Sequence, residues 1–93
     1  MITAFVFVRT ELGQVNAVAG ALADLPQVSE VYSVTGAVDL IALVRVKANE
    51  DIAAAVTTAV ATIPGILGTE THIAFRSYSR HDLEAAFSVG LGD

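Results

Sequence analysis

Apolar residues in the first third of the chain fall into three segments with different spacings. The stretch Ile2–Val8 is rich in β-branched and aromatic residues, which favours a β-strand. Between Val15 and Leu25 the apolar positions recur at helical spacing, and Pro26 ends this helix because proline cannot continue it. Val28–Val34 has the composition of a second strand. The pattern therefore predicts a strand, a helix and a strand in this order.

The same order of elements follows in the next part of the chain. After a turn at Thr35-Gly36, the largely apolar stretch Asp39–Val46 predicts a strand. Ile52–Ile63 carries apolar residues at helical spacing, and Pro64-Gly65 stops that helix. Thr69–Tyr78 is then expected to form the last strand. The whole chain reads as β-α-β followed by β-α-β.

Two polar clusters are typical of helix starts. Asn49 is expected to cap the second helix, and Glu50 and Asp51 suit its first turn because acidic side chains are favourable there. Ser79–Asp82 resembles a capping box at the start of a short C-terminal helix. The apolar residues of that helix share one face, which we expect to pack on its own subunit or, as an alternative, on a neighbour.

The two halves of the chain are related by a repeat. A shift of 38 positions aligns residues 4–28 with residues 42–66 without gaps, and it superimposes Pro26 on Pro64. Eight of the 25 aligned pairs are identical and five more are conservative exchanges. The aligned prolines and the absence of gaps indicate two copies of one structural unit.

The order of elements predicts an α+β fold, the ferredoxin-like βαββαβ plait, with two helices on one face of an antiparallel sheet. The first and third strands are continuous apolar runs, as expected of central strands. The second and fourth contain polar residues, as expected of edge strands. Since two helices cover only one face, we expect the sheet of another subunit to pack on the open face and form a dimer.

The composition and charge of the chain exclude several classes of protein. The 93 residues suffice for one domain, 54% of them are apolar, and the formal net charge is −5. The five basic residues form no run, which argues against direct binding of nucleic acid. There is no cysteine, no signal-like segment and no apolar stretch long enough for a membrane span. The sequence reads as a cytoplasmic protein that contacts neither nucleic acid nor membrane.

No catalytic constellation is recognisable. His72 and His81 are nine residues apart on different expected elements, so they lack the spacing of a metal pair. There is no nucleophile elbow, no phosphate-binding glycine loop and no suggestive pair of carboxylates. We therefore predict no catalytic residue, no metal site and no cofactor.

One polar group of residues remains as a candidate binding site. Thr35, Gly36 and Asp39 lie in the turn between the middle strands, and Thr69 and Thr71 lie in the last strand. Backbone N–H groups around a glycine turn can bind a carboxylate, and a nearby aspartate can pair with an ammonium group, as a zwitterionic amino acid requires. The alternative is purely structural: the glycine supplies the turn conformation and the aspartate satisfies backbone N–H groups.

The segment V-Y-S-V-T-G-A-V-D-L-I-A-L-V-R-V (Val31–Val46), followed by I-P-G-I-L-G-T-E-T (Ile63–Thr71), resembles the effector-binding domain of the Lrp/AsnC family of feast/famine regulators, known as RAM. The family pattern is T-G-x-x-D before an apolar strand and then a P-G-x-x-x-T-x-T-like segment. We take residues 1–78 as this domain and residues 79–93 as a C-terminal helix and tail.

The resemblance implies a dimeric α/β sandwich that assembles further, with a small effector, typically an amino acid, bound between dimers. Carried over to this sequence, the effector loop falls on Thr35, Gly36 and Asp39, and the last strand contributes Thr69 and Thr71. The Gly36 backbone is expected to bind the carboxylate and Asp39 the ammonium. Family members also carry an N-terminal helix-turn-helix domain, whereas this sequence opens on the first strand. It resembles a stand-alone form that pairs with full-length Lrp/AsnC regulators.

Two other functions are compatible with the same fold. One is a structural assembly domain whose only activity is oligomerisation. The other is a small dimeric enzyme in which His72 acts as acid or base inside a closed apolar cavity, and this requires His72 to point inward.

Overall fold

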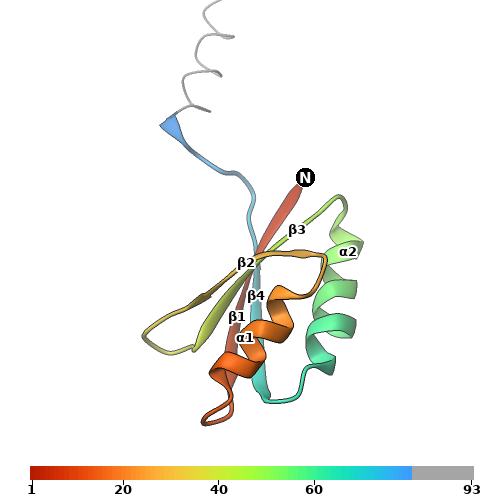
Figure 1. The fold of residues 1–93 in the computed structure, drawn as a ribbon. Coiled ribbons are helices and arrows are strands. Elements are labelled where there is room, and N and C mark those ends of the chain that lie inside the picture. The colour runs from red at the N-terminus through yellow and green to blue at the C-terminus, as the bar shows by residue number, and fades with distance from the viewer. Residues whose placement is uncertain (81–93) are drawn as a thin grey trace, which may run out of the picture.

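The computed structural model describes residues 1–80 (Figure 1). Its elements are β1 (Ile2–Thr10), α1 (Val15–Ala23), β2 (Val28–Ser33), β3 (Leu40–Val46), α2 (Asn49–Ala54), the π-helical segment η1 (Ala55–Ala59), the 3-10 turn η2 (Val60–Thr62) and β4 (Ile66–Ile73). The segments α2, η1 and η2 follow one another directly and fill the stretch for which one helix is predicted. In this described part, no helix is long and apolar enough to cross a bilayer.

The four strands form one antiparallel sheet in the order β2-β3-β1-β4. The two apolar strands β1 and β3 are central and the two mixed strands are at the edges, as predicted. Both helices lie on the same side of this sheet (Figure 1). The α+β ferredoxin-like arrangement expected from the sequence is confirmed.

The 38-residue repeat is also visible in the fold. Shifting each element of the first half by 38 positions brings β1 onto β3, α1 onto the segment that contains η1, and β2 onto β4. Each half therefore contributes one central strand, one helical layer and one edge strand. The repeat in the sequence therefore corresponds to a repeat in the structure.

Two sequence-based expectations are wrong in detail. The last strand is Ile66–Ile73 rather than Thr69–Tyr78. It starts early because Ile66 already pairs with Thr10, and its last residue, Ile73, pairs with Ala4. The Ala74 N–H then donates a hydrogen bond to the Thr3 carbonyl at 2.9 Å. Asn49 is not a side-chain cap: it is the first residue of α2, and its side chain makes no capping hydrogen bond. The expected C-terminal helix, from His81 onward, lies outside the described residues.

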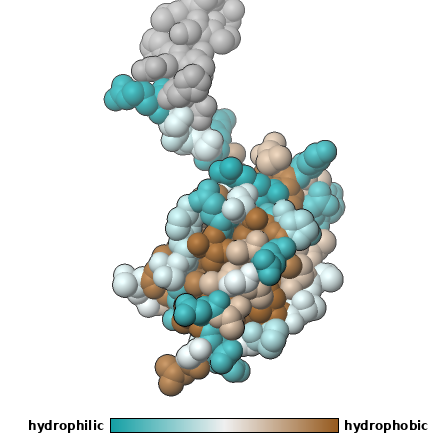
Figure 2. All heavy atoms as spheres, viewed as in Figure 1, coloured by the Kyte–Doolittle hydropathy of each residue, from teal (hydrophilic) through white to brown (hydrophobic). Residues whose placement is uncertain are grey.

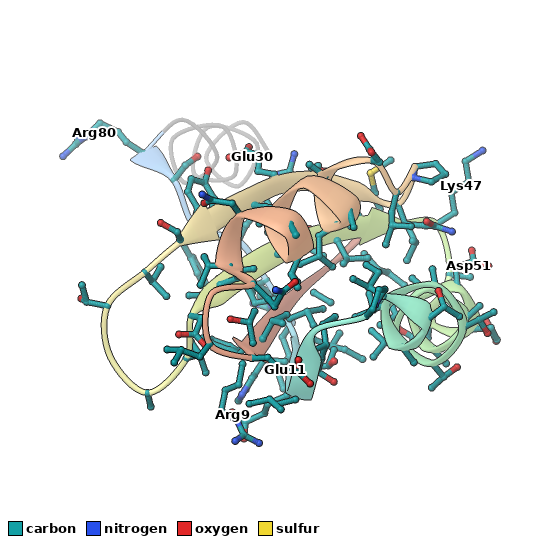
Figure 3. The ribbon with its side chains drawn as sticks, turned by 60° about the horizontal axis from the view of Figure 1, so that its bottom comes forward. Arg9, Glu11, Glu30, Lys47, Asp51 and Arg80 are labelled. Carbon is teal, nitrogen blue, oxygen red and sulfur yellow. The ribbon has the colours of Figure 1, made fainter. Side chains whose placement is uncertain are left out.

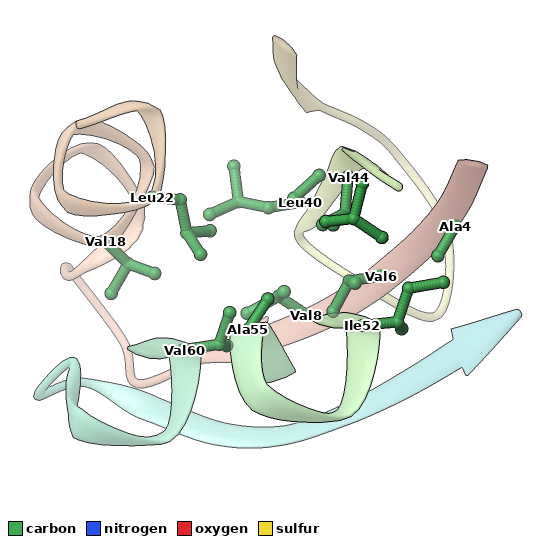
Figure 4. Close-up of a cluster of buried hydrophobic side chains, with 12 residues drawn as sticks. Ala4, Val6, Val8, Val18, Leu22, Leu40, Val44, Ile52, Ala55 and Val60 are labelled. Atoms are coloured by element: carbon green, nitrogen blue, oxygen red, sulfur yellow. The ribbon is translucent and has the colours of Figure 1, made fainter. Parts of the chain in front are cut away.

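The helix-covered face of the sheet holds the core (Figure 4). The core consists of fully or almost fully buried side chains from β1, β3 and the helical segments that pack on them. They are Ala4, Val6, Val8, Val18, Leu22, Leu40, Ala42, Val44, Val46, Ile52, Ala55 and Val60. On β1 and β3 these are alternate residues, because successive side chains of a strand point to opposite faces. The other alternate residues must therefore lie on the opposite face, which no helix of the described residues covers.

This open face has an apolar centre and a polar border. Its central residues are Phe5 and Phe7 of β1, which pair with Leu43 and Ile41 of β3. The same rows continue outward to Glu30 and Tyr32 on β2 and to His72 and Glu70 on β4. The side chain of Phe5 is 40% exposed although it lies in the middle of the sheet. Figure 2, in the view of Figure 1, shows the opposite side of the molecule, where hydrophobic side chains gather in the middle of the body and hydrophilic ones lie around them.

Candidate functional site

The β2–β3 loop presents a row of backbone N–H groups to solvent. Gly36, at φ +115°, adopts a conformation that side chains rarely allow, and no atom lies within 4 Å of the position a Cβ would occupy. Thr35 and Ala37 on either side are exposed. Within the described chain, none of the N–H groups from Thr35 to Val38 donates a backbone hydrogen bond. The glycine is therefore required by the backbone turn and not by packing, and the loop can accept an external hydrogen-bond acceptor.

Asp39, just before β3, makes hydrogen bonds to β1 and to the residue that follows β2. Its carboxylate Oδ2 accepts a hydrogen bond of 2.8 Å from the Thr10 N–H at the end of β1. Its own N–H donates to the Val8 carbonyl at 3.0 Å, and its carbonyl accepts from the Val34 N–H at 3.1 Å. The bonded N–H belongs to Thr10, where the register of β1 and β4 shifts. Asp39 thus has a structural task, while Oδ1 takes no part in a hydrogen bond within residues 1–80.

Thr69 and Thr71 lie on the opposite side of β1 from this loop. They pair with Val8 and Val6, so their side chains project on the helix side of the edge strand β4. Two strand spacings, about 10 Å, separate them from the corresponding residues of β3. One chain therefore brings Thr35, Gly36 and Asp39 together at one end of the sheet but does not bring the two threonines into contact with them.

The second glycine motif has a packing role. Gly65 has φ +95°, and a Cβ there would lie 3.1 Å from Val18 Cγ2 and 3.2 Å from Gln14 Cβ of the first helical region. Its carbonyl accepts a hydrogen bond of 2.7 Å from the Glu11 N–H. Pro64-Gly65 therefore fixes the entry to β4 against the start of α1.

A small apolar pocket adjoins Thr69. It has a volume of about 230 Å³ between the η1–η2 segment and the start of β4. Its lining comprises Val56, Val60, Ala61, Ile66, Leu67, Gly68 and Thr69. Thr69 is thus a polar residue beside an apolar pocket, whereas Thr71 lies farther along the strand.

His72 lies on the open face rather than inside the body. Its Nε2 is 2.8 Å from Glu70 Oε2, and its ring meets Phe7 edge-on with centroids 5.0 Å apart. Its side chain is 59% exposed. The inward orientation that an acid–base role in a closed cavity requires is absent from the single chain. Among residues 1–80, no three metal-binding side chains come together, and His81 lies outside this range.

Sequence reasoning missed the way Arg9 crosses the edge of the sheet. Arg9 pairs with Gly68, and its Nη2 lies only 2.6 Å from where a Cβ of residue 68 would be. Figure 3 shows Arg9 and Glu11 close to one another at the bottom of the view, away from Lys47 and Asp51 at the right. The position of Arg9 could have been expected from the sequence, because Phe5, Phe7 and Arg9 alternate along the first strand and therefore lie on one face.

A match to a protein-family model shows which family this chain belongs to. The model of the "Lrp/AsnC ligand binding domain" matches residues 3–83. The chain belongs to this family. The resemblance found in the T-G-x-x-D and P-G-x-x-x-T-x-T segments is confirmed over most of the sequence.

Individual relatives agree with this membership. The HTH-type transcriptional regulator FL11 of Pyrococcus horikoshii is 33% identical over 75 residues, which cover 81% of this chain and 49% of the regulator. The chain spans about half the length of the curated relatives it matches. TTHA0845 from Thermus thermophilus is 51% identical with a TM-score of 0.81, over 86% of this chain and 100% of that one.

A more distant structure shares the fold of this Lrp/AsnC domain. It is the transcriptional regulator NMB0573 from Neisseria meningitidis, solved as a complex with L-Met. Identity is 14%, the TM-score is 0.76, and the match covers 85% of this chain and 53% of that one. The relatives named as regulators point to a regulatory rather than an enzymatic role.

Proposed function

We propose that this domain is the sensing module of a regulatory assembly that binds an amino acid through the β2–β3 loop and catalyses no reaction. Regulation and ligand binding are properties of its family. It acts in the cytoplasm, as an oligomer of its own copies or with full-length Lrp/AsnC regulators, and does not itself bind DNA.

The observation that carries the proposal is the set of unpaired N–H groups around Gly36. A carboxylate is the ligand group that such a turn accepts best, because successive N–H groups form a concave site of positive potential. Asp39 Oδ1, which has no hydrogen bond in the described chain, then accepts from the ammonium group. The two ends of a zwitterion are matched within one loop.

Thr69 and Thr71 enter the site from a second copy. Since β1 and β3 separate them from the loop of their own chain, they complete the site only where two copies meet. The apolar pocket beside Thr69 then suits an apolar side chain of the bound amino acid. Ligand binding and assembly are coupled in this arrangement.

A thermal-shift screen against the standard amino acids at fixed protein concentration tests this function, with L-methionine first because the Neisseria regulator was solved with it. A ligand at one hundred times its Kd adds about 2.7 kcal/mol to the free energy of unfolding. For a domain of this size the melting temperature rises by about 10 °C. A screen in which no amino acid shifts the midpoint favours the assembly domain without a ligand.

Matched variants locate the site. Asp39→Asn keeps an oxygen that can accept from the Thr10 N–H but removes the charge, so we expect the fold to persist and the ligand-induced shift to disappear. Thr71→Val, with a near-identical shape, removes one hydroxyl from the part contributed by the other copy. Thr57→Val is the control, since its hydroxyl donates to the Ala53 carbonyl of its own helix. A full ligand shift in Asp39→Asn would remove this carboxylate from the site.

A further inference from the structure

A hollow lies at the end of the open face where the chain leaves the sheet. It has a volume of about 620 Å³ and lies between the face and residues 75–78, which we call the arm. Arg45 of β3 pairs there with Thr3 of β1, and the Ala74 N–H bonds to the Thr3 carbonyl just before the arm begins. The arm then leads away from the sheet (Figure 1). The hollow is therefore bordered by β1, β3 and the arm.

Positive charge is concentrated in this hollow. Arg45 and Arg76 line it, and both are exposed. Among residues 1–80, no acidic side chain lines the hollow, and neither guanidinium group makes an ion pair or a hydrogen bond. A neighbouring hollow of about 610 Å³ over β2 and β3 differs, because Glu30 lines it together with Arg45. In a chain with ten acidic and five basic residues, the hollow beside the arm is thus a site of uncompensated positive charge.

The other side chains of the hollow suit a ligand with a flat ring. Phe5 lines it from the sheet, and Phe75 and Tyr78 line it from the arm. Phe75 is fully exposed and Tyr78 is largely exposed, so their rings have surface left for a further aromatic contact. Thr3 and Ser77 add hydroxyl groups that can donate hydrogen bonds.

We propose that this hollow binds a small organic anion in which a phosphate or carboxylate group is joined to an aromatic ring. The anionic group lies between Arg45 and Arg76, because a guanidinium group presents N–H donors in a fork that matches the oxygens of both anions. The ring packs against the aromatic side chains of the arm. The volume is in the range of small-molecule sites, which leaves room for a ring beside the anionic group.

This site is separate from the proposed amino-acid site, and the inference does not rest on that function. Asp39 comes just before β3 and Arg45 lies near its end, so six residues, or about 20 Å of strand, separate them. A second copy packed on the open face would also cover the hollow. Because burying an unpaired charge is costly, assembly increases the need for an anion between the two arginines.

Isothermal titration calorimetry of the full chain in about 0.1 M salt tests the site with phenyl phosphate and with benzoate. Inorganic phosphate and phenol are the comparison ligands, since each carries one half of phenyl phosphate. We expect the tighter binder of the first two to bind at least about tenfold more tightly than either comparison ligand. Inorganic phosphate that binds as tightly as phenyl phosphate would overturn the proposal.

Matched arginine variants locate the anionic group. Arg45→Gln and Arg76→Gln should each raise the Kd of the tighter ligand by at least about tenfold, because a charge-assisted hydrogen bond is lost. Arg9→Gln is the control, since Arg9 is also exposed and the change in net charge is the same. It lies six residues beyond Thr3 on β1, about 20 Å away, which is twice the screening length in this salt. Equal losses in Arg9→Gln and Arg45→Gln would show that binding follows net charge alone, which overturns the site.

A variant of the arm separates the contact with the ring from the contact with the charge. Phe75→Ala should weaken phenyl phosphate but leave the affinity for inorganic phosphate unchanged, because only the first ligand has a ring. An unchanged ratio of the two Kd values would overturn the contact of the ring with the arm.

The remaining outcomes concern assembly and the amino-acid site. Absence of binding by both phenyl phosphate and benzoate overturns the proposal. If Arg45→Gln then weakens the dimer in sedimentation, an acidic residue of a second copy neutralises the arginine in place of a bound anion. The amino-acid screen of the proposed function uses other ligands and another end of the sheet, so failure of either experiment leaves the other proposal standing.

Discussion

The two faces of the sheet are built by the same strands, yet they differ in what completes them. On one face Val6, Val8 and Val44 are completely buried beneath helices of their own chain. On the other face lie Phe5 and Phe7, and no helix of residues 1–80 covers them. The open face carries the larger side chains and the charged border, whereas the covered face carries small aliphatic ones.

This difference explains why so short a chain is so apolar. A strand covered on one face alternates between apolar and polar residues, but β1 and β3 are apolar on both faces over most of their length. The chain can bury only one face by itself. The comparison leads to separable expectations: changes on the covered face affect folding, and changes on the open face affect association.

The largest effect is expected on the covered face. Leu22→Ala removes a fully buried side chain of α1, and the cavity should lower the free energy of unfolding by about 2–5 kcal/mol. Urea denaturation measures this loss. Leu12→Ala, at a position that is 102% exposed, is the matched control and should stay within about 0.5 kcal/mol of the wild type. Equal losses in the two variants would contradict the assignment of the core.

On the open face we expect a loss of association instead. Phe5→Glu introduces a charge at the centre of the apolar rows, and a buried unpaired charge is strongly unfavourable in an interface. The dimer Kd should rise by about a hundredfold or more, while the circular dichroism of the folded monomer is retained. Sedimentation velocity over a range of concentrations gives the Kd. An unchanged Kd would show that this face is not the interface.

A smaller effect is expected at the glycine that joins the layers. Gly65→Ala adds a Cβ in a left-handed conformation, 3.1 Å from Val18, and should cost about 1–3 kcal/mol of stability. Gly20→Ala is the control: Gly20 is helical with no atom near its Cβ position, so this change should stabilise the protein by about 0.5–1 kcal/mol. Thermal unfolding of both variants should shift the midpoint in opposite directions. A shift in the same direction would refute the packing role of Gly65.

Sequence patterns were sufficient for the layout of the fold and for the repeat. Pro26 and Pro64 mark both helix ends, and the apolar runs identify both central strands. The limits of β4 were not predictable in this way, because a strand ends where its neighbour stops pairing, and the partner of Ile73 is Ala4 of a distant segment. The same applies to Asn49, whose residue type favours a cap but which lies inside the helix.

The candidate site was predictable only in part. Thr35, Gly36 and Asp39 are close in sequence, so their grouping followed from the turn itself. The bond from the Thr10 N–H to Asp39 spans 29 positions and has no local signature. The distance between this loop and Thr69 follows from the strand order, because β1 lies between β3 and the edge strand β4. The partner of the Asp39 carboxylate, the Thr10 N–H, therefore emerges only from the fold.

The central claim is that the open face is completed by a second copy, and the reactivity of a single introduced cysteine tests it most directly. Ile41→Cys, Val6→Cys and Leu12→Cys report on the open face, the covered face and free solvent, in a chain without other thiols. Leu12→Cys should react rapidly at every protein concentration, and Val6→Cys slowly at every concentration. We predict that Ile41→Cys reacts rapidly when dilute and at least about tenfold more slowly at concentrations where the dimer forms. A rate for Ile41→Cys that does not depend on protein concentration would contradict the account.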